Sequence, residues 1–532
     1  MRQLERDIDR DLEELAGSKT AWARLSIEHK IVMLRNVQNS VYEMAPQWVD
    51  AAAQAKGLRP GSPLAGEEWI SGPWAVLYAI ARYLRTLRGL ALDGRVPLPA
   101  IHFRNDRTKL DVFPYDTYDR VLLNGIRAQV WMQPGVAPSD VQHCAAPFYK
   151  MPAPPGRVAL ILGAGNIASI APLDVLYKML AGGAVCMLKM NPVNDYLGPI
   201  FERALQPLVE RGFLRFAYGG ADVGEYLCAH PIVDEIHVTG SERTHNAIAF
   251  GAGSGKPLTS ELGNVSPTIV VPGRWNTRDV QFQAENIATQ KAHNAGFNCI
   301  ASQVLILPRD WPQARELRDR VERVFAAMEH RPEYYPGATQ RRTALAGPDS
   351  SLRTVVMLDH ADIDHAAFLS EAFCGVLACV EIPGDLEAFV PRAVAFANDR
   401  LHGTLGANII VHPQTLREHG AVMEAAVAGL RYGCVGVNAW TGVGYFITET
   451  PWGAYPGHTR ENVGSGVGVV HNAYFLERTE KSVVYAPFRQ FPKPVWFVTH
   501  KMAAHVGRAL CDFEVARTPM SALKVAVAAL LG

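Results

Sequence analysis

The chain of 532 residues lacks features that mark several common protein classes. Its eight cysteines are far apart and include no C-x-x-C pair, so neither a disulfide framework nor a cysteine-based zinc site is expected. Basic and acidic residues both number 52, and a zero net charge argues against a nucleic-acid partner. No run reaches the ~18 apolar residues of a membrane span, so no integral membrane segment is expected.

Two common hydrolase motifs are absent as well. There is no G-x-S-x-G elbow and no H-E-x-x-H pair, which argues against an α/β-hydrolase and a zinc hydrolase. The composition, 48% hydrophobic and 20% charged, is that of a folded globular chain with room for roughly three to four domains. The N-terminus resembles a charged amphipathic helix and not a signal peptide. We therefore expect a cytoplasmic protein without a metal site.

Hydrophobic periodicity predicts a helical start and then an α/β pattern. Residues 1–95 have apolar positions at helical spacing, whereas 95–157 is broken by prolines and has one predicted strand near 126–132. The strands predicted after this point are 157–162, 184–189, 235–241, 268–271, 302–307, 354–358, 376–382, 407–411 and 482–485. The helices predicted between them are 163–180, 197–210, 277–294, 311–330 and 386–398. Such alternation is typical of a parallel, doubly wound sheet.

Two glycine-rich segments invite a nucleotide-binding interpretation. Gly163-Ala-Gly-Asn-Ile-Ala168 fits G-x-G-x-x-A after a strand, but Lys189 stands near the place of the usual acidic ribose partner. Residues 251–257 nearly match a P-loop, although Phe250 replaces its first glycine and Pro257 its magnesium-binding hydroxyl residue. The second match is the poorer one, so an NTP-dependent enzyme is a distant alternative.

A lone cysteine stands in an unusual setting. Cys299 lies in a polar, glycine-containing turn between a predicted helix and a predicted strand, whereas most lone cysteines pack in cores. A free thiol with a pKa of ~8.5 is only a few per cent thiolate at neutral pH, so a nucleophilic cysteine needs activation. A carboxylate elsewhere in the chain could act as a base.

Taken together, these segments resemble the aldehyde dehydrogenase superfamily from about residue 155 to residue 485. The similar motifs, in chain order, are Val238-Thr-Gly-Ser241 (F-T-G-S), Glu261-Leu-Gly-Asn-Val-Ser-Pro267 (E-L-G-G-K-S-P), Asn294-Ala-Gly-Phe-Asn-Cys299 (N-x-G-Q-x-C), Glu371-Ala-Phe-Cys-Gly-Val-Leu377 (E-I-F-G-P-V-L), His402-Gly-Thr-Leu-Gly-Ala407 (Y-G-L-G-A), Cys434-Val-Gly-Val-Asn438 (G-x-V-x-V-N), Pro451-Trp-Gly-Ala-Tyr-Pro-Gly457 (P-F-G-G-x-K-x-S-G) and Glu480-Lys-Ser-Val483 (T-x-K-x-V). Each match is weak alone, but their common order makes chance agreement improbable.

The resemblance implies a fold and a chemistry. The fold would be α/β, with a Rossmann-type cofactor domain, an α/β catalytic domain and a small oligomerisation hairpin. The activity would be NAD- or NADP-dependent oxidation of an aldehyde to a carboxylic acid. Cys299 would be the nucleophile, Asn166 an oxyanion donor and Glu261 the base that activates water. The implied cofactor contacts are Lys189, Gly240, Ser241, Glu371 and Phe373. The 163–168 glycines would then shape the Asn166 turn and would not cradle a pyrophosphate.

Departures from the family pattern leave some points open. Pro192 replaces a glutamate that favours NAD, so NAD and NADP both remain, and His245 replaces a common glycine. Residues 330–352 match no family motif, which leaves the substrate tunnel undefined. A hydrophobic or aromatic aldehyde is suggested by aromatic residues nearby, namely Trp440, Tyr445, Phe446 and Trp452. A CoA-acylating dehydrogenase or acyl-CoA reductase, and a non-catalytic scaffold, remain as alternatives.

The resemblance also predicts how the chain is divided. Residues 1–124 and 152–260 would form the cofactor domain, 261–473 the catalytic domain, and 125–151 with 474–491 the oligomerisation element. A homodimer or homotetramer is expected. Residues 492–532 would form a C-terminal tail, in which Ser521–Leu531 is apolar and helix-like but too short to span a membrane. This segment would pack on a neighbouring subunit or over the substrate entrance, with peripheral membrane contact as an alternative.

Overall fold

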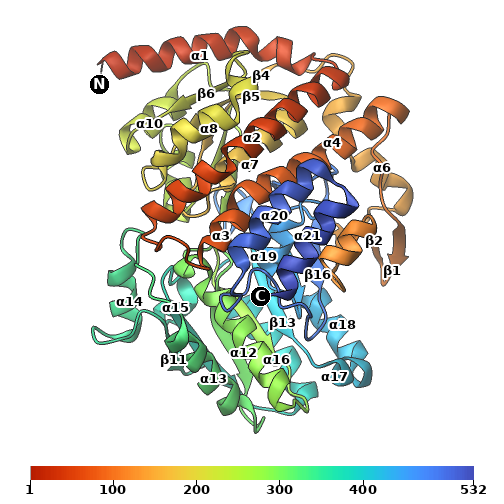
Figure 1. Cartoon of the computed structure of the whole chain (residues 1–532), viewed down its shortest axis with the longest axis vertical. Coiled ribbons are helices and arrows are strands. Elements are labelled where there is room, and N and C mark those ends of the chain that lie inside the picture. Colours follow the sequence, from red (N-terminus) through yellow and green to blue (C-terminus); the bar gives the residue numbers. More distant parts are fainter. Residues whose placement is uncertain (1) are drawn as a thin grey trace.

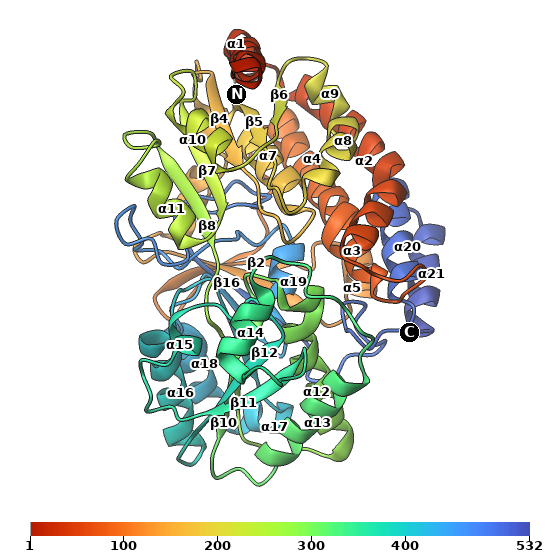
Figure 2. The same cartoon turned by 90° about the vertical axis from the view of Figure 1, so that its left-hand side faces the viewer.

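The structure is a computed structural model that describes residues 2–532, and it is built around two β-sheets. A six-stranded sheet lies in the upper half of Figure 2 and a ten-stranded sheet in the lower half, with helices around both. The N-terminal helix runs along the top of the molecule, and the C-terminus lies near its middle (Figure 1). The α/β fold class predicted from the sequence is confirmed.

Most of residues 2–93 are helical, as predicted. The elements are α1 (Arg2–Ala23), α2 (Ile27–Ala55), α3 (Ala65–Trp69), a π-helical turn η1 (Ile70–Trp74) and α4 (Ala75–Asp93). Ser26 caps α2 by accepting a hydrogen bond from the His29 N–H, which satisfies one of the donors left free at a helix start. Helix α1 packs on β4 to β6, and α2 packs along α4, so this segment encloses one side of the six-stranded sheet.

The six-stranded sheet has the order β15-β8-β7-β4-β5-β6, and all of its pairings except β15–β8 are parallel. Its strands are β4 (Arg157–Leu162), β5 (Ala184–Lys189), β6 (Leu214–Ala217), β7 (Glu235–Gly240), β8 (Leu258–Leu262) and β15 (Gly466–Val467). Its helices are α7 (Ile170–Gly182), α8 (Gly198–Ala204), α9 (Gln206–Val209), α10 (Ala221–Ala229) and α11 (Glu242–Ala249). The sequence predicted a single helix over 197–210, but the structure has two helices there, α8 and α9. They are separate because Leu205, which stands shortly before Pro207, leaves helical geometry.

The ten-stranded sheet has the order β1-β2-β3-β16-β14-β13-β9-β10-β12-β11. Its strands are β1 (Ile101–Arg104), β2 (Arg107–Phe113), β3 (Arg127–Met132), β9 (Ser266–Val270), β10 (Ser302–Pro308), β11 (Thr354–Leu358), β12 (Val376–Ile382), β13 (Gly406–Ile410), β14 (Cys434–Val437) and β16 (Thr479–Tyr485). Its main helices are α12 (Thr277–Ala292), α13 (Ala314–Ala327), α14 (Ala338–Ala346), α15 (Ala366–Leu369), α16 (Leu386–Arg400), α17 (Pro413–Glu418), α18 (Gly420–Gly429) and α19 (Thr441–Phe446). The seven strands from β16 to β11 run parallel, as the alternation predicted.

The proline-rich segment contains more strand than its sequence suggests. Strands β1 and β2 form an antiparallel hairpin whose turn uses left-handed Asn105 and Asp106, and β2 pairs with β3. The hairpin therefore belongs to the ten-stranded sheet, although it falls within the 1–124 part of the predicted cofactor domain. The functional division of the chain stays a prediction. The short elements nearby are α5 (Thr117–Leu122), η2 (Pro138–Asp140), α6 (Val141–Cys144) and η3 (Pro147–Lys150).

The tail packs on its own chain. It folds as an antiparallel helix pair, α20 (Ala503–Ala516) and α21 (Pro519–Leu530), and α20 lies against α3 (Figure 1). Two glycines permit this close approach. A Cβ atom on Gly66 would lie 2.4 Å from Ala503, and one on Gly507 would lie 2.5 Å from Trp69.

Candidate functional site

One cavity, of about 830 Å³, gathers every site residue that the sequence predicted. It opens at the carboxyl ends of β4, β5, β7 and β8, which is where ligands bind in open α/β sheets. Its lining includes Asn166, Lys189, Gly240, Ser241, Glu261, Cys299, Glu371 and Phe373. The roles assigned to these residues stay predictions, but their meeting in one cavity is a structural fact.

Cys299 is held by a turn with unusual backbone geometry. The turn connects α12 to β10, and three consecutive residues in it, Asn294, Ala295 and Gly296, have positive φ angles of 53°, 57° and 86°. The thiol is half-buried, whereas the other seven cysteines are buried. Burial raises the pKa of Cys299, and the nearby carboxylates of Glu261 and Glu371 raise it further.

Glu261 faces Cys299 from strand β8 and is only 5% exposed. Its carboxylate accepts a hydrogen bond from Nε1 of Trp452 at 2.9 Å. Burial raises the pKa of Glu261 to about 8, in spite of the opposing effects of Trp452 and Cys299. A carboxyl group with such a pKa changes its charge near neutral pH, as a general base must.

A network of buried polar side chains, centred on Asp174, lies beside Glu261. Thr239 on β7 is paired in register with Glu261, and its hydroxyl donates to Asp174 at 2.8 Å. Asp174 is fully buried on α7 and is flanked by two imidazoles, with 3.5 Å to Nε2 of His237 and 3.4 Å to Nε2 of His471. The charge of Asp174 contributes to the raised pKa of Glu261.

Asn166 lies in the turn between β4 and α7 and reaches toward the cysteine turn. Its Nδ2 atom donates to the carbonyl oxygen of Phe297 at 2.9 Å. An amide nitrogen carries two hydrogens, so a second donor remains for a group in the cavity. Gly165 is required here, because a Cβ atom would lie 2.6 Å from Oδ1 of Asn191. The absence of a side chain on Gly165 thus allows this turn to pack against Asn191.

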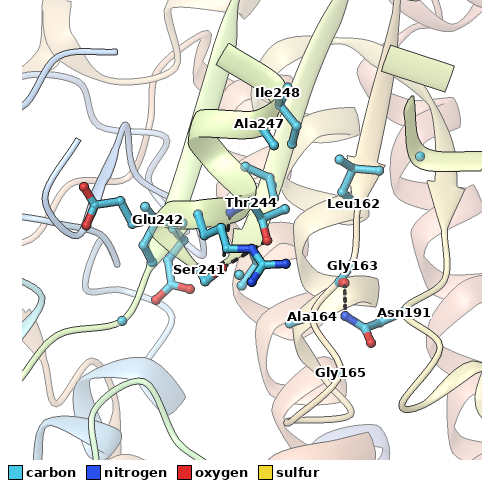
Figure 3. A pocket seen from close by; sticks show the side chains of 18 of the residues that line it. Leu162, Gly163, Ala164, Gly165, Asn191, Ser241, Glu242, Thr244, Ala247 and Ile248 are labelled. Atoms are coloured by element: carbon cyan, nitrogen blue, oxygen red, sulfur yellow. Dashed lines mark hydrogen bonds between the residues drawn. The ribbon is translucent and has the colours of Figure 1, made fainter. Parts of the chain in front are cut away.

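Figure 3 shows the end of the cavity at which cofactor contacts are predicted, with α11 on one side and the Gly163–Gly165 turn on the other. Ser241 caps α11 by accepting from the Thr244 N–H, and Asn191 donates to the Gly163 carbonyl at 3.3 Å. Lys189 ends β5 beside them, and burial lowers the pKa of its ammonium group. A helix start and a buried lysine are both suited to a negatively charged ligand.

Glu371 and Phe373 close the cavity from the loop before β12. A Cβ atom on Gly263 would lie 2.0 Å from the Glu371 carboxylate, so only glycine permits this approach. Burial raises the pKa of Glu371 to about 8, and its buried Oε1 atom has no hydrogen-bond partner among residues 2–532. Phe373 has a positive φ of 40°, and Arg341 binds its carbonyl oxygen at 3.0 Å.

Sequence reasoning missed some residues of the site. Arg341 and Tyr335 line the cavity, and both come from the 330–352 region, which matches no family motif. The sequence suggests only that Trp452 lies near the substrate. In the structure its side chain is 1% exposed, and its indole N–H donates a hydrogen bond to Glu261. Trp440 is likewise buried, and its Nε1 donates to the Ile300 carbonyl at 3.1 Å. A matching aromatic in the family motif could have suggested the position of Trp452.

Known proteins provide an independent comparison. The sequence profile of the Aldehyde dehydrogenase family matches residues 137–339. N-succinylglutamate 5-semialdehyde dehydrogenase of Sphingopyxis alaskensis is 27% identical over 298 residues, which are 52% of this chain and 61% of the relative. A probable coniferyl aldehyde dehydrogenase of Pseudomonas aeruginosa is 26% identical over 39% of this chain and 43% of its own. The chain thus covers about three fifths of the length of the first of these relatives and less of the second.

Solved structures agree over nearly the whole fold. Aldehyde dehydrogenase C of Pseudomonas syringae, in complex with NAD+ and octanal, superposes with a TM-score of 0.62 at 17% identity, covering 91% of this chain and 90% of the other. A glyceraldehyde-3-phosphate dehydrogenase of Methanocaldococcus jannaschii, complexed with NADP, gives a TM-score of 0.60 at 15% identity, with 91% and 95% covered. Residues 137–339 thus match the aldehyde dehydrogenase family, and the chain as a whole resembles aldehyde dehydrogenases in sequence and in fold. The resemblance seen in the motifs is confirmed, as is the aldehyde dehydrogenase fold.

Other features of this aldehyde dehydrogenase homologue bear on the remaining expectations. No helix within residues 2–532 is long and apolar enough to cross a membrane. No group of three or more His, Cys, Asp or Glu side chains in the same residues could hold a metal ion. In the P-loop-like segment, Lys256 donates to the His230 carbonyl instead of facing the cavity, which gives no support to the NTP-dependent alternative.

Proposed function

We propose that the chain oxidises an aldehyde to its carboxylic acid, with NAD or NADP as acceptor, through covalent intermediates on Cys299. The observation that carries this proposal is the shared cavity, in which a nucleophile, a base and an amide donor lie beside residues suited to a dinucleotide. Since the chain covers only part of its curated relatives, the activity is inferred from this site and is not transferred from a name.

The residues present fit a dinucleotide. The start of α11 and the buried ammonium group of Lys189 suit a pyrophosphate and a ribose, and the unpartnered Oε1 of Glu371 offers an acceptor to a ribose hydroxyl. Phe373 lies at the same wall of the cavity as Glu371. When bound, an oxidised nicotinamide supplies the acceptor for the hydrogen that leaves the aldehyde carbon with its electron pair.

The chain's own residues would perform the other steps. The Cys299 thiol would give its proton to Glu261, which returns the proton to solvent before the later hydrolysis. The resulting thiolate adds to the aldehyde carbon and forms a C–S bond while the electron pair of the C=O π bond moves to oxygen, giving a thiohemiacetal whose oxygen gains negative charge. The second N–H of the Asn166 amide, together with the Cys299 backbone N–H, would donate to this oxygen. After oxidation, a thioester remains on Cys299. Glu261 takes a proton from water, the water oxygen adds to the thioester carbon, and the C–S bond breaks to release the acid.

A direct assay tests the proposal. Aldehydes are offered with NAD and with NADP, with and without CoA, and the reduced cofactor, acid and acyl-CoA products are measured. We expect the wild type to form the acid and Cys299→Ala to form none. The control variant Cys511→Ala, which alters a buried thiol in α20, should retain turnover. Acyl-CoA formation with negligible acid would favour the CoA-acylating alternative, and turnover that survives Cys299→Ala would refute the mechanism.

The substrate class is part of the proposal. Tyr335 and Phe373 line the cavity together with Cys299, and their ring centroids are 4.9 Å apart in an edge-to-face arrangement. The fully buried ring of Phe297 packs against both of them. These rings favour a hydrophobic or aromatic aldehyde. The panel should therefore compare an aromatic, a long aliphatic and a small polar aldehyde, and a clear preference for the last would contradict this assignment.

We also propose that the chain self-associates through the edge of its ten-stranded sheet. The sequence predicts the contact at 125–151 with 474–491, and within these segments β3 and β16 pair with each other inside the sheet. The two edge strands of the ten-stranded sheet are β1 and β11, and on β1 the side chain of Phe103 is 61% exposed. Unpaired edges are sites at which another chain can add a strand. Light scattering in solution measures the expected dimer or tetramer.

A further inference from the structure

A buried cluster of four charged side chains lies directly behind the Cys299 turn. Lys56 and Arg331 pair with Glu67 and Glu68, and all four side chains are between 1% and 6% exposed. Nζ of Lys56 is 2.8 Å from Glu68, Nη2 of Arg331 is 3.2 Å from Glu68, and Nη1 of Arg331 binds Glu67. Two positive and two negative charges make the cluster neutral overall.

The cluster converges on one side chain, Asn294. Its Oδ1 atom accepts from Lys56 at 3.1 Å, from Arg331 at 3.3 Å and from the Tyr334 hydroxyl at 2.9 Å. Its backbone N–H donates to Glu67 at 2.8 Å. These contacts come from α2, α3 and the segment before α14, which are far apart in the sequence.

The other end of Asn294 joins the two loops of the candidate active site. Its Nδ2 atom donates to the Asn166 carbonyl at 2.9 Å and to the Phe297 carbonyl at 3.1 Å. The Asn166 side chain donates to the same Phe297 carbonyl. Asn294 therefore ties the loop of the amide donor to the loop of the nucleophile, and its orientation fixes their relative position.

The backbone of this turn needs such support. Left-handed geometry is unfavourable for residues other than glycine, and both Asn294 and Ala295 adopt it. Buried charges are also costly, and well-packed apolar residues often stabilise a fold equally well. A role in holding the strained Cys299 turn in a single geometry would explain why a fully paired ionic cluster is buried at this place.

We propose that Lys56, Glu68, Arg331 and Tyr334 are positioning residues that act through Asn294 to set the geometry between Asn166 and Cys299. The roles of Asn166 and Cys299 in turnover rest on the proposed function, but the reactivity of the Cys299 thiol does not. Loss of the cluster should slow the reaction of this thiol as well as catalysis, because a displacement of about 1 Å can cost on the order of 10²-fold in rate.

The same chain contains a matched control. Arg82 forms an equally buried network with Asp119, Glu449 and Glu514, and Tyr78 donates to Glu449 at 3.1 Å. None of these five residues lines the cavity. Variants in this second network report the general cost of disturbing a buried ionic cluster.

The experiment compares Glu68→Gln with Glu449→Gln, and Tyr334→Phe with Tyr78→Phe. Each pair is assayed for the melting temperature, for the rate of Cys299 alkylation by iodoacetamide located by mass spectrometry, and for kcat and KM. We expect a similar loss of melting temperature within each pair. Only Glu68→Gln and Tyr334→Phe should slow alkylation and kcat, by about tenfold or more for Glu68→Gln, with KM for the cofactor little changed.

Alkylation at the wild-type rate in folded Glu68→Gln and Tyr334→Phe would overturn the proposal, as would equal slowing in the control variants. The tyrosine pair keeps the test decisive if the glutamine variants do not fold, since it removes only one hydroxyl from each network. If the wild-type protein oxidises no aldehyde, the proposed function fails, but the alkylation rates still decide whether the cluster positions Cys299.

Discussion

Replacing Glu261 by glutamine should stabilise the protein, and the gain should grow with pH. The carboxyl group is 5% exposed, and burial raises its pKa from 4.5 to about 8. Between these values the folded protein holds a proton that the unfolded chain has released. The free energy of unfolding of the wild type therefore falls as pH rises from about 4.5 to about 8. Glutamine carries no charge, yet its side-chain oxygen can still accept from Trp452.

The magnitude follows from the same pKa values. Each pK unit corresponds to about 1.4 kcal/mol, so the ionised group costs the folded state about 5 kcal/mol well above pH 8, but only about 1 kcal/mol at pH 5. A chain of 532 residues that unfolds as one unit has an unfolding entropy of roughly 1.1 kcal/mol/K. The advantage of Glu261→Gln in melting temperature should therefore be about 1 °C at pH 5 and about 4 °C at pH 9.

The assay is a thermal melt of both proteins at pH 5, 7 and 9 in buffers of equal ionic strength. Glu13→Gln, on the exposed side of α1, controls for the removal of one negative charge and should track the wild type at every pH. The critical result is how the difference in melting temperature between Glu261→Gln and the wild type changes with pH, and not the size of that difference at one pH. A melting-temperature difference that is the same at pH 5 and pH 9 would refute the assignment of a raised pKa to Glu261.

Four further results are expected. Trp452→Phe removes the hydrogen bond that lowers the pKa of Glu261, so the rise of kcat with pH should move to higher pH, and an unmoved profile would contradict this. Asp174→Asn removes a charge that raises the same pKa, so the profile should move to lower pH, measured in the same assay. Lys189→Met should raise KM for the nucleotide at least about tenfold with little change in kcat, and an unchanged KM would remove Lys189 from the site. Phe103→Asp at the free edge of β1 should shift a dimer or tetramer toward smaller species in light scattering, and an unchanged mass would place the contact elsewhere.

The sequence predicted those elements whose signal is local. The strands over 157–162 and 184–189 are observed as predicted, because short apolar runs between glycine-containing turns have few alternatives in an α/β chain. The hairpin at 101–113 was missed because its strands are short and lie among prolines, and they are stabilised by pairing with β3 rather than by their own pattern. The tail helices were only partly predicted, since the contact of α20 with α3 depends on glycines more than 400 residues apart.

By itself, the sequence determined the resemblance to aldehyde dehydrogenases and the set of candidate site residues, because motif order and residue type are properties of the chain. Cys299, Glu261 and Asn166 could be named from their motifs, but not the distances or charges between them. Only the tertiary structure decided that Glu261 is buried against Trp452, which raises its pKa, and that a neutral ionic cluster holds the Cys299 turn through Asn294. The physical reason is that desolvation and ion pairing depend on which segments meet in space. Lys56 and Arg331, for example, are far apart in the sequence, yet both donate hydrogen bonds to Asn294.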